Sequence, residues 1–294
     1  MRPRREEIRT IVALLVETKI DTSSKNEALF WAAGNEPLVI TTQSQQKTSD
    51  QAINSVDNYY TEVARLLLDK GAQVGATDAD GATPLIRAAS HGETGVVKLL
   101  LDRGAEIEAR DQAGGTALLG AACECAVIDM PDTLGAIKLL LEKGANIEAS
   151  DNQGNTPLIV AAAWGPTENV EFLLERHANI EARKNDGNTA LSVSASGGGY
   201  PTVETVKFLL DHGSKIEAKD NEGRTPLISA AAGDGTDQIG IVKLLLERGA
   251  DVRSRDKHGD TALSFAQKDR TPEIIEGTHA ELVKMLKSAM ATPH

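Results

Sequence analysis

The chain has 294 residues, a formal net charge of −12 and only 3% aromatic residues. An acidic chain disfavours nucleic acid or an anionic membrane as its main partner, and few aromatics argue against a base-stacking platform. Two cysteines cannot build a disulfide framework, which fits a reducing, cytoplasmic location, and no apolar run approaches the length of a membrane span.

The N-terminal quarter of the chain predicts helices in an irregular arrangement. Helices are expected from Ile11 to Asp21, over residues 28–33, where Trp31 is assigned to the core, and over residues 62–72. The stretch from about 35 to 58 is rich in Ser, Thr, Gln and Asn, which is typical of a polar insertion loop. Residues 1–75 are therefore expected to form irregular capping repeats.

Further along the chain, a Gly-x-Thr-(Pro/Ala)-Leu pattern recurs with a long period. The spacings between successive copies are 33, 40, 33, 36 and 36 residues. Periods in this range indicate stacked supersecondary units rather than one closed core. Such stacks bind along an extended surface and seldom carry out chemistry. The copies begin at Gly81, Gly114, Gly154, Gly187, Gly223 and Gly259.

One unit, residues 76–108, shows how the pattern specifies structure. Gly81 suits a turn, Thr83 is a good N-cap, and Pro84 is favoured at the first helical position. A short helix over 85–89 and a second helix over 96–101 follow, and Gly104 caps the second helix before an extended arm. The leucine of each pattern should be buried, which contributes roughly 2 kcal/mol per residue. These leucines are Leu85, Leu118, Leu158, Leu191, Leu227 and Leu263.

These units closely resemble the ankyrin repeat from about residue 76 to residue 289, as in Arg-Thr-Pro-Leu at 224–227 and Val-Lys-Leu-Leu-Leu at 242–246. The resemblance implies an all-α, ankyrin-type solenoid of about seven helix-turn-helix repeats with short extended hairpin arms. It places five regular repeats over 76–253 (76–108, 109–148, 149–181, 182–217 and 218–253) and a C-terminal capping repeat with a tail over 254–294. The family's usual His after Pro-Leu is absent, and Glu replaces the usual Asn of the arm.

The resemblance also implies a function, namely a non-catalytic module or scaffold that binds a partner protein through the concave face of the array. No cofactor or metal is expected, and the protein is expected to be a monomer. The contact positions of the family, transferred residue by residue, fall on side chains that vary from unit to unit. They are Asp80, His91, Gln112, Glu124, Asn152, Gln153, Asn155, Trp164, Asn185, Asp186, Asn188, Asn221, Glu222, Arg224, Lys257 and His258.

Several alternatives stay open at this point. Trp164 is either a binding anchor or a cover for the edge of the core. The chain is either a passive scaffold or an inhibitor, or immunity-type regulator, of a partner enzyme. A more remote alternative is an enzyme with a site in the inter-helix insertions, around Cys123, Cys125 and Asp129. The insertions themselves are either tolerated loops or a second functional surface.

Charged residues two apart recur in the extended arms, as in Glu108/Arg110, Glu181/Arg183 and Glu217/Lys219. Residues two apart in an extended segment share a face, so stacked arms should carry a ladder of alternating charge. One interpretation is a solubilising surface lattice, and the other is a basic stripe that meets an acidic partner.

Overall fold

The computed structural model describes residues 21–34, 60–123, 132–197, 203–233, 237–267 and 276–291. Within these ranges the secondary structure consists of helices joined by turns, without strands. The chain divides into two compact units, Met1–Asn152 and Gln153–His294. The predicted all-α class is confirmed. The helix expected from Ile11 to Asp21, the polar loop of about 35–58 and the side chain of Trp31 lie outside the described part of the chain.

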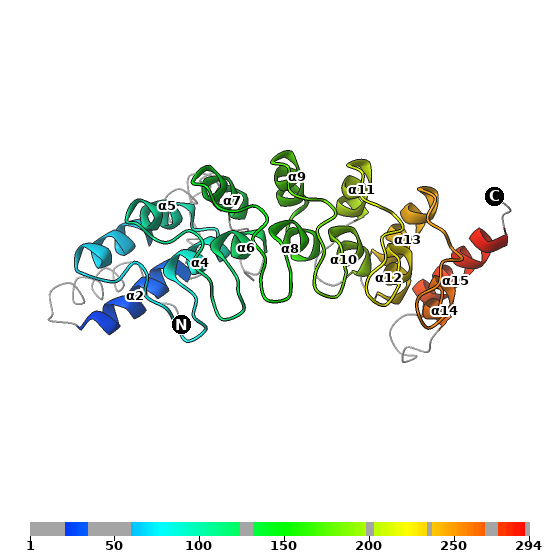
Figure 1. The fold of residues 1–294 in the computed structure, drawn as a ribbon, viewed down its shortest axis with the longest axis horizontal. Coiled ribbons are helices and arrows are strands. Elements are labelled where there is room, and N and C mark those ends of the chain that lie inside the picture. The colour runs from blue at the N-terminus through cyan, green and yellow to red at the C-terminus, as the bar shows by residue number, and fades with distance from the viewer. Residues whose placement is uncertain are drawn as a thin grey trace, which may run out of the picture. The chain divides into compact units, whose positions relative to one another are not determined.

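The first unit is a stack of helix pairs. Helix α4 packs against both α2 and α6, and α5 packs beside α7 (Figure 1). From α4 on, each first helix follows a hairpin turn, and a second helix packs on it. The helices are α2 (Thr22–Gly34), residues 60–69, α4 (Pro84–Ser90), α5 (Thr94–Asp102), α6 (Ala117–Ala122) and α7 (Thr133–Glu142).

The second unit repeats this arrangement. The first helix α10 packs between α8 and α12, and α12 also packs on α14, whereas the second helix α11 packs beside α9 and α13 (Figure 1). The helices are α8 (Pro157–Trp164), α9 (Thr167–Glu175), α10 (Ala190–Ser196), α11 (Val203–Asp211), α12 (Pro226–Ala232), α13 (Gln238–Glu247), α14 (Ala262–Gln267) and α15 (Glu276–Ala291).

Local sequence explains where these helices begin and end. Each Thr of the repeated pattern is an N-cap, as where the Oγ1 atom of Thr83 accepts the backbone N–H of Ile86 at 3.3 Å. The second helices end on a residue with positive φ, which is usually glycine, such as Gly213 with φ of 91°. His177 occupies the corresponding place after α9 with φ of 66°, and it is the one non-glycine residue with positive φ in the described ranges.

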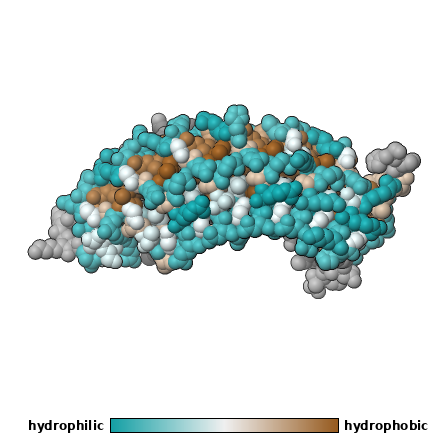
Figure 2. Space-filling view, in the orientation of Figure 1, coloured by the Kyte–Doolittle hydropathy of each residue, from teal (hydrophilic) through white to brown (hydrophobic). Residues whose placement is uncertain are grey.

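The repeated leucines form the core of each unit, as expected. Five of the six are 1% exposed, whereas Leu263 in α14 is only half-buried. The terminal position of α14 accounts for this difference, because a capping repeat faces water on one side. In the space-filling view, apolar patches gather over the second helices of the first unit, and the side of the hairpin turns is mostly hydrophilic (Figure 2).

Candidate functional site

Hairpin turns precede the first helices, and we call the turns at residues 78–82, 111–115, 151–155, 184–188, 220–224 and 256–260 the fingers. Five of these fingers share one closing backbone bond of the same kind, as from Asp78 N to Ala82 O at 3.0 Å. In most fingers the first residue is an aspartate whose carboxylate also accepts backbone N–H groups. The Oδ1 atom of Asp220, for example, accepts Glu222 N at 2.9 Å and Arg224 N at 2.8 Å. The sequence therefore fixes the shape of each finger locally.

In the first unit, neighbouring fingers are joined by a regular ladder of hydrogen bonds. Gln112 donates its backbone N–H to Asp80 O at 3.0 Å, and Asn152 donates to Ala113 O at 2.9 Å. The side-chain amides add parallel bonds, from Gln112 Nε2 to Ala79 O at 3.0 Å and from Asn152 Nδ2 to Gln112 O at 2.9 Å. Gln112 and Asn152 are thus exposed residues that also hold the frame together.

The second unit has the same ladder. Asn185 donates its backbone N–H to Gln153 O at 3.0 Å, Asn221 to Asp186 O at 2.8 Å, and Lys257 to Glu222 O at 2.9 Å. The Nδ2 atom of Asn221 adds a bond to Asn185 O at 2.8 Å. These bonds fix the position of each finger relative to the next.

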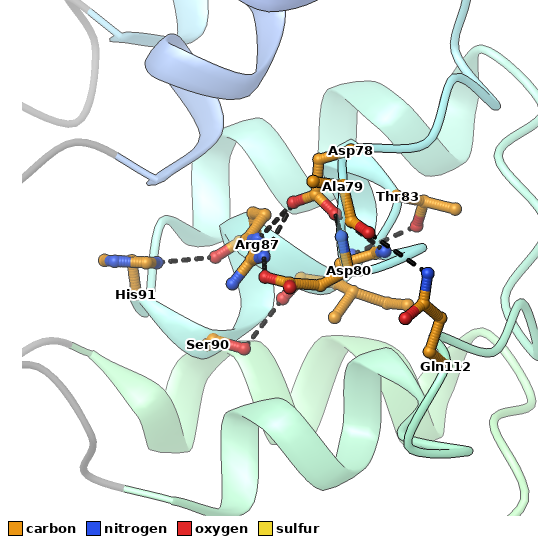
Figure 3. Close-up of polar contacts among 10 residues, drawn as sticks. Asp78, Ala79, Asp80, Thr83, Arg87, Ser90, His91 and Gln112 are labelled. Atoms are coloured by element: carbon orange, nitrogen blue, oxygen red, sulfur yellow. Dashed lines mark hydrogen bonds and ion pairs between the residues drawn. The ribbon is translucent and has the colours of Figure 1, made fainter.

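Arg87 ties the first finger to its own helix. Its Nε atom donates to the Oδ2 atom of Asp78 at 2.7 Å, and its Nη2 atom lies 2.8 Å from the Oδ2 atom of Asp80 (Figure 3). Burial lowers the pKa of Arg87, but the two carboxylates outweigh it and hold that pKa above its ordinary value. His91 lies one turn further along α4, and its Nδ1 atom lies 2.9 Å from Arg87 O. These contacts hold the side chains of Asp80 and His91 against α4.

The first helices of the second unit carry no charged residue, whereas α2 and α4 of the first unit do. Trp164, at the end of α8, is 41% exposed and is one of two large exposed apolar side chains in the described residues. The corresponding positions in the next two repeats are Gly197 and Gly233. The guanidinium of Arg224 lies over the Phe265 ring, with Cζ 5.3 Å from the ring centroid. Of these three equivalent positions, Trp164 alone therefore carries a side chain.

Charged finger residues of the second unit pair with close neighbours. Lys184 Nζ lies 3.4 Å from the Oδ2 atom of Asp186, and His258 Nε2 lies 3.3 Å from the Oε2 atom of Glu222. Partial burial raises the pKa of Asp186, but hydrogen bonds from Asn188 and the charge of Lys184 outweigh this and hold the pKa below 3.8. Asp186 is therefore a carboxylate at neutral pH.

Most of the predicted contact residues are at least partly exposed. Asn155 differs, because it is 5% exposed and presents almost no surface. Glu124 lies outside the described residues, as do most residues of the inter-helix insertions. The remaining predicted residues fall on fingers or at the ends of first helices, in one unit or the other. They are Asp80, His91, Gln112 and Asn152 in the first unit, and Gln153, Trp164, Asn185, Asp186, Asn188, Asn221, Glu222, Arg224, Lys257 and His258 in the second.

Cys123 lies at the end of α6 and is disulfide-bonded, while Cys125 and Asp129 lie outside the described residues. Within the described ranges no group of three or more His, Cys, Asp or Glu side chains is placed to hold a metal ion. No helix in those ranges is long and apolar enough to cross a bilayer.

Stacked helix pairs with hairpin fingers define a helical repeat protein. A family model described as ankyrin repeats (3 copies) matches residues 42–111, 108–184, 177–256 and 204–289. The chain therefore belongs to the ankyrin repeat family, as its sequence pattern predicted. Ankyrin repeats generally mediate protein–protein interaction, and the family is typically non-catalytic.

Solved structures show the same fold. The ankyrin repeat domain of human ASB11 matches with a TM-score of 0.65 and 23% identity, over 82% of this chain and 98% of that chain. The ankyrin repeat domain of Bcl-3, described as a unique member of the IkappaB protein family, matches with a TM-score of 0.56 and 25% identity, over 80% of this chain and 95% of that chain. No curated protein sequence matches this chain.

Proposed function

We propose that this chain is a non-catalytic interaction module that binds a partner protein through the surface formed by the fingers and the ends of the first helices. The contact residues are those predicted from the sequence, apart from the buried Asn155. Binding requires little ordering of this surface, because hydrogen bonds already hold the fingers in place. Recognition then depends on the side chains that the frame presents.

One observation carries the proposal, namely that side chains vary where the backbone performs the same task. The third finger residue is Asp80, Ala113, Asp186 or Glu222, and each accepts a backbone N–H of the next finger through its carbonyl oxygen. The backbone bond does not depend on the side chain, so the side chain is free to differ from repeat to repeat. A constant frame with variable exposed side chains is what selective recognition of one partner needs.

The test is affinity capture from the native lysate with four forms of the full chain, namely the wild type and three variants. The first variant combines Trp164→Ala, Glu222→Ala and His258→Ala in the second unit, and the other combines Asp80→Ala with His91→Ala in the first unit. The control is Lys243→Ala, whose side chain is 64% exposed on the second helix α13. All forms are first compared by thermal unfolding, because only variants that still fold cooperatively are informative.

We expect the same protein to be captured by the wild type and the Lys243→Ala control and to be lost from at least one finger variant. The pattern of loss also tells which unit carries the contact. If both finger variants capture the protein as well as the wild type does, the proposed surface is refuted, even though the chain would still be a binding protein.

An inhibitor or immunity-type regulator of a partner enzyme would use the same surface, and it differs only in what binding does to the partner. Titration of the captured protein separates the two possibilities, because an inhibitor abolishes activity at a one-to-one ratio.

The proposal also assigns no catalytic role to Cys123, Cys125 or Asp129, and it includes a monomeric state, a cytoplasmic location and no binding of nucleic acid or membranes. Replacement of both cysteines by serine should leave partner capture unchanged. Sedimentation equilibrium tests the oligomeric state, and fluorescence microscopy of the tagged chain tests the location.

A further inference from the structure

The repeat over residues 182–217, in the middle of the second unit, departs from its neighbours at several buried positions. Ser194 in α10 is 0% exposed, and its Oγ atom has no hydrogen-bond partner in the described residues. The other first helices place a buried alanine at this position. These residues are Ala88, Ala121, Ala161, Ala230 and Ala266. A buried hydroxyl without a partner loses its hydration and gains nothing in return.

The same defect recurs at the end of this repeat. Ser214 is 8% exposed, and its Oγ atom also lacks a partner among the described residues. The corresponding residue of the two flanking repeats is Ala178 or Ala250. The repeat therefore buries two unsatisfied hydroxyl groups at positions where the pattern supplies methyl groups.

Two further features weaken the same region. His177, which ends the helix just before this repeat, has φ of 66°, a conformation that strains any residue with a Cβ atom. Ser192 replaces the buried isoleucine of the neighbouring first helices, Ile159 and Ile228, so α10 buries less apolar surface. The Ser192 hydroxyl is satisfied, because its Oγ atom accepts Thr189 N at 2.7 Å and donates to Thr189 O at 3.0 Å.

From this cluster of defects we infer that the repeat over 182–217 is a built-in opening point, at which α10 and α11 unfold locally while helices on either side remain folded. In a stack of repeats, the free energy of unfolding is approximately the sum of the intrinsic stability of each repeat and the stabilisation from each interface between neighbours. Opening of any interior repeat breaks two interfaces, so a low intrinsic stability makes this repeat easier to open than the interior repeats that flank it.

Opening of this repeat has a consequence for binding, which rests on the proposed function. It breaks the bond from Asn221 N to Asp186 O that holds two fingers together. A partner that contacts both fingers binds the closed form alone, so binding suppresses opening, and the open fraction reduces the apparent affinity. The opening itself does not depend on any partner.

Hydrogen–deuterium exchange of the full chain, read by mass spectrometry without any partner, tests the inference. We expect amides of residues 190–196 and 203–211 to exchange about tenfold or more faster than those of α8 and α12, as one or two unsatisfied buried groups imply. The combined variant His177→Gly, Ser194→Ala and Ser214→Ala should remove most of that difference and leave exchange in the first unit unchanged.

Two single variants in α10 give opposite expectations. Ser194→Ala removes a hydroxyl without a partner and should slow exchange of α10 by about tenfold, whereas Ser192→Ala removes a bonded hydroxyl and should accelerate it. The inference is wrong if α10 and α11 are as protected as α8 and α12 in the wild type. It is equally wrong if the combined variant leaves their exchange unchanged.

Discussion

The Oε1 atom of Glu181 accepts the backbone N–H of Lys215, which lies in the arm of the following repeat, at 2.8 Å. The same relationship recurs in the second unit between Glu217 and Asp251 at 2.8 Å, and in the first unit between Glu108 and Asn146 at 2.7 Å. These glutamates occupy the place of the family's usual arm asparagine. A recurring side chain that was expected to be a surface feature thus joins one repeat to the next.

The arginine two positions after Glu181, and the one two positions after Glu108, also form hydrogen bonds to the backbone. The Nη1 atom of Arg183 donates to Gly187 O at 2.8 Å and to Lys219 O at 2.7 Å, so it links its own finger to the next arm. Arg110 makes the same pair of bonds in the first unit. Neither a solubilising lattice nor a basic stripe for a partner includes this role. The periodicity of side chains in the sequence does not show which backbone carbonyl groups lie within their reach.

Replacing Glu181 therefore tests an inter-repeat bond. We expect Glu181→Ala to lower the free energy of unfolding by about 1 kcal/mol, because the N–H of Lys215 loses its acceptor in a partly exposed setting. Glu181→Gln keeps an acceptor oxygen at the same distance and should lose less than half of that amount. Urea unfolding provides the measurement, with Glu175→Ala on the exposed face of α9 as the control. Equal losses for Ala and Gln would show that charge, not the hydrogen bond, is responsible.

The strained histidine gives a prediction of opposite sign. His177→Gly should raise the free energy of unfolding by about 0.5–1 kcal/mol, because glycine adopts the positive φ of this position without a steric penalty. The reverse change at the equivalent position, Gly213→Ala, should lower it by a similar amount. Gly213 has φ of 91° and no atom within 4 Å of an added Cβ, so its substitution reports backbone strain alone. Stabilisation by Gly213→Ala would contradict this account.

Much of the fold could be predicted from the sequence, because the determinants of each repeat are local. Thr156 before Pro157 specifies a helix start, and Gly249 after α13 specifies a helix end, without reference to distant residues. Repetition then predicts stacking, since each pair must bury the apolar face that it cannot cover alone. The family and the all-α class followed from these signals.

The site was less predictable, because finger contacts join residues more than thirty positions apart. Asn221 was predicted as a contact residue from its exposed position, yet its Nδ2 atom also donates to Asn185 O. Asn155 was predicted for the same reason, but the structure buries it. Sequence position identifies a finger residue, whereas only the packing of the next finger decides how much of its side chain remains for a partner.

Packing between fingers also predicts how a single glycine is tolerated. A Cβ atom on Gly187, which has φ of 85°, would lie 2.7 Å from Asn221 N in the next finger. Gly187→Ala should therefore cost about 2–4 kcal/mol, of which roughly 1 kcal/mol is backbone strain and the rest the displaced finger. Gly213→Ala, with similar φ and open space, isolates the strain term. If both alanine variants unfold at the same urea concentration, the fingers yield to the added methyl group and the ladder is not rigid.

Asp211 links two second helices by charge and makes stability depend on pH. Its Oδ2 atom lies 2.8 Å from Lys207 Nζ, and its Oδ1 atom lies 2.7 Å from Nη1 of Arg248, the C-cap residue of α13. Hydrogen bonds from these two cations lower the pKa of Asp211 below 3.8. A lowered folded-state pKa contributes stability that is present above the unfolded value and is lost as the pH falls through the folded value.

Asp211→Asn should thus destabilise the protein at pH 7. The difference in stability from the wild type should shrink below about pH 4, and also in 1 M salt, where the charges are screened. Urea midpoints measured from pH 7 to pH 3 test this, and a difference that stays constant over that range would contradict it.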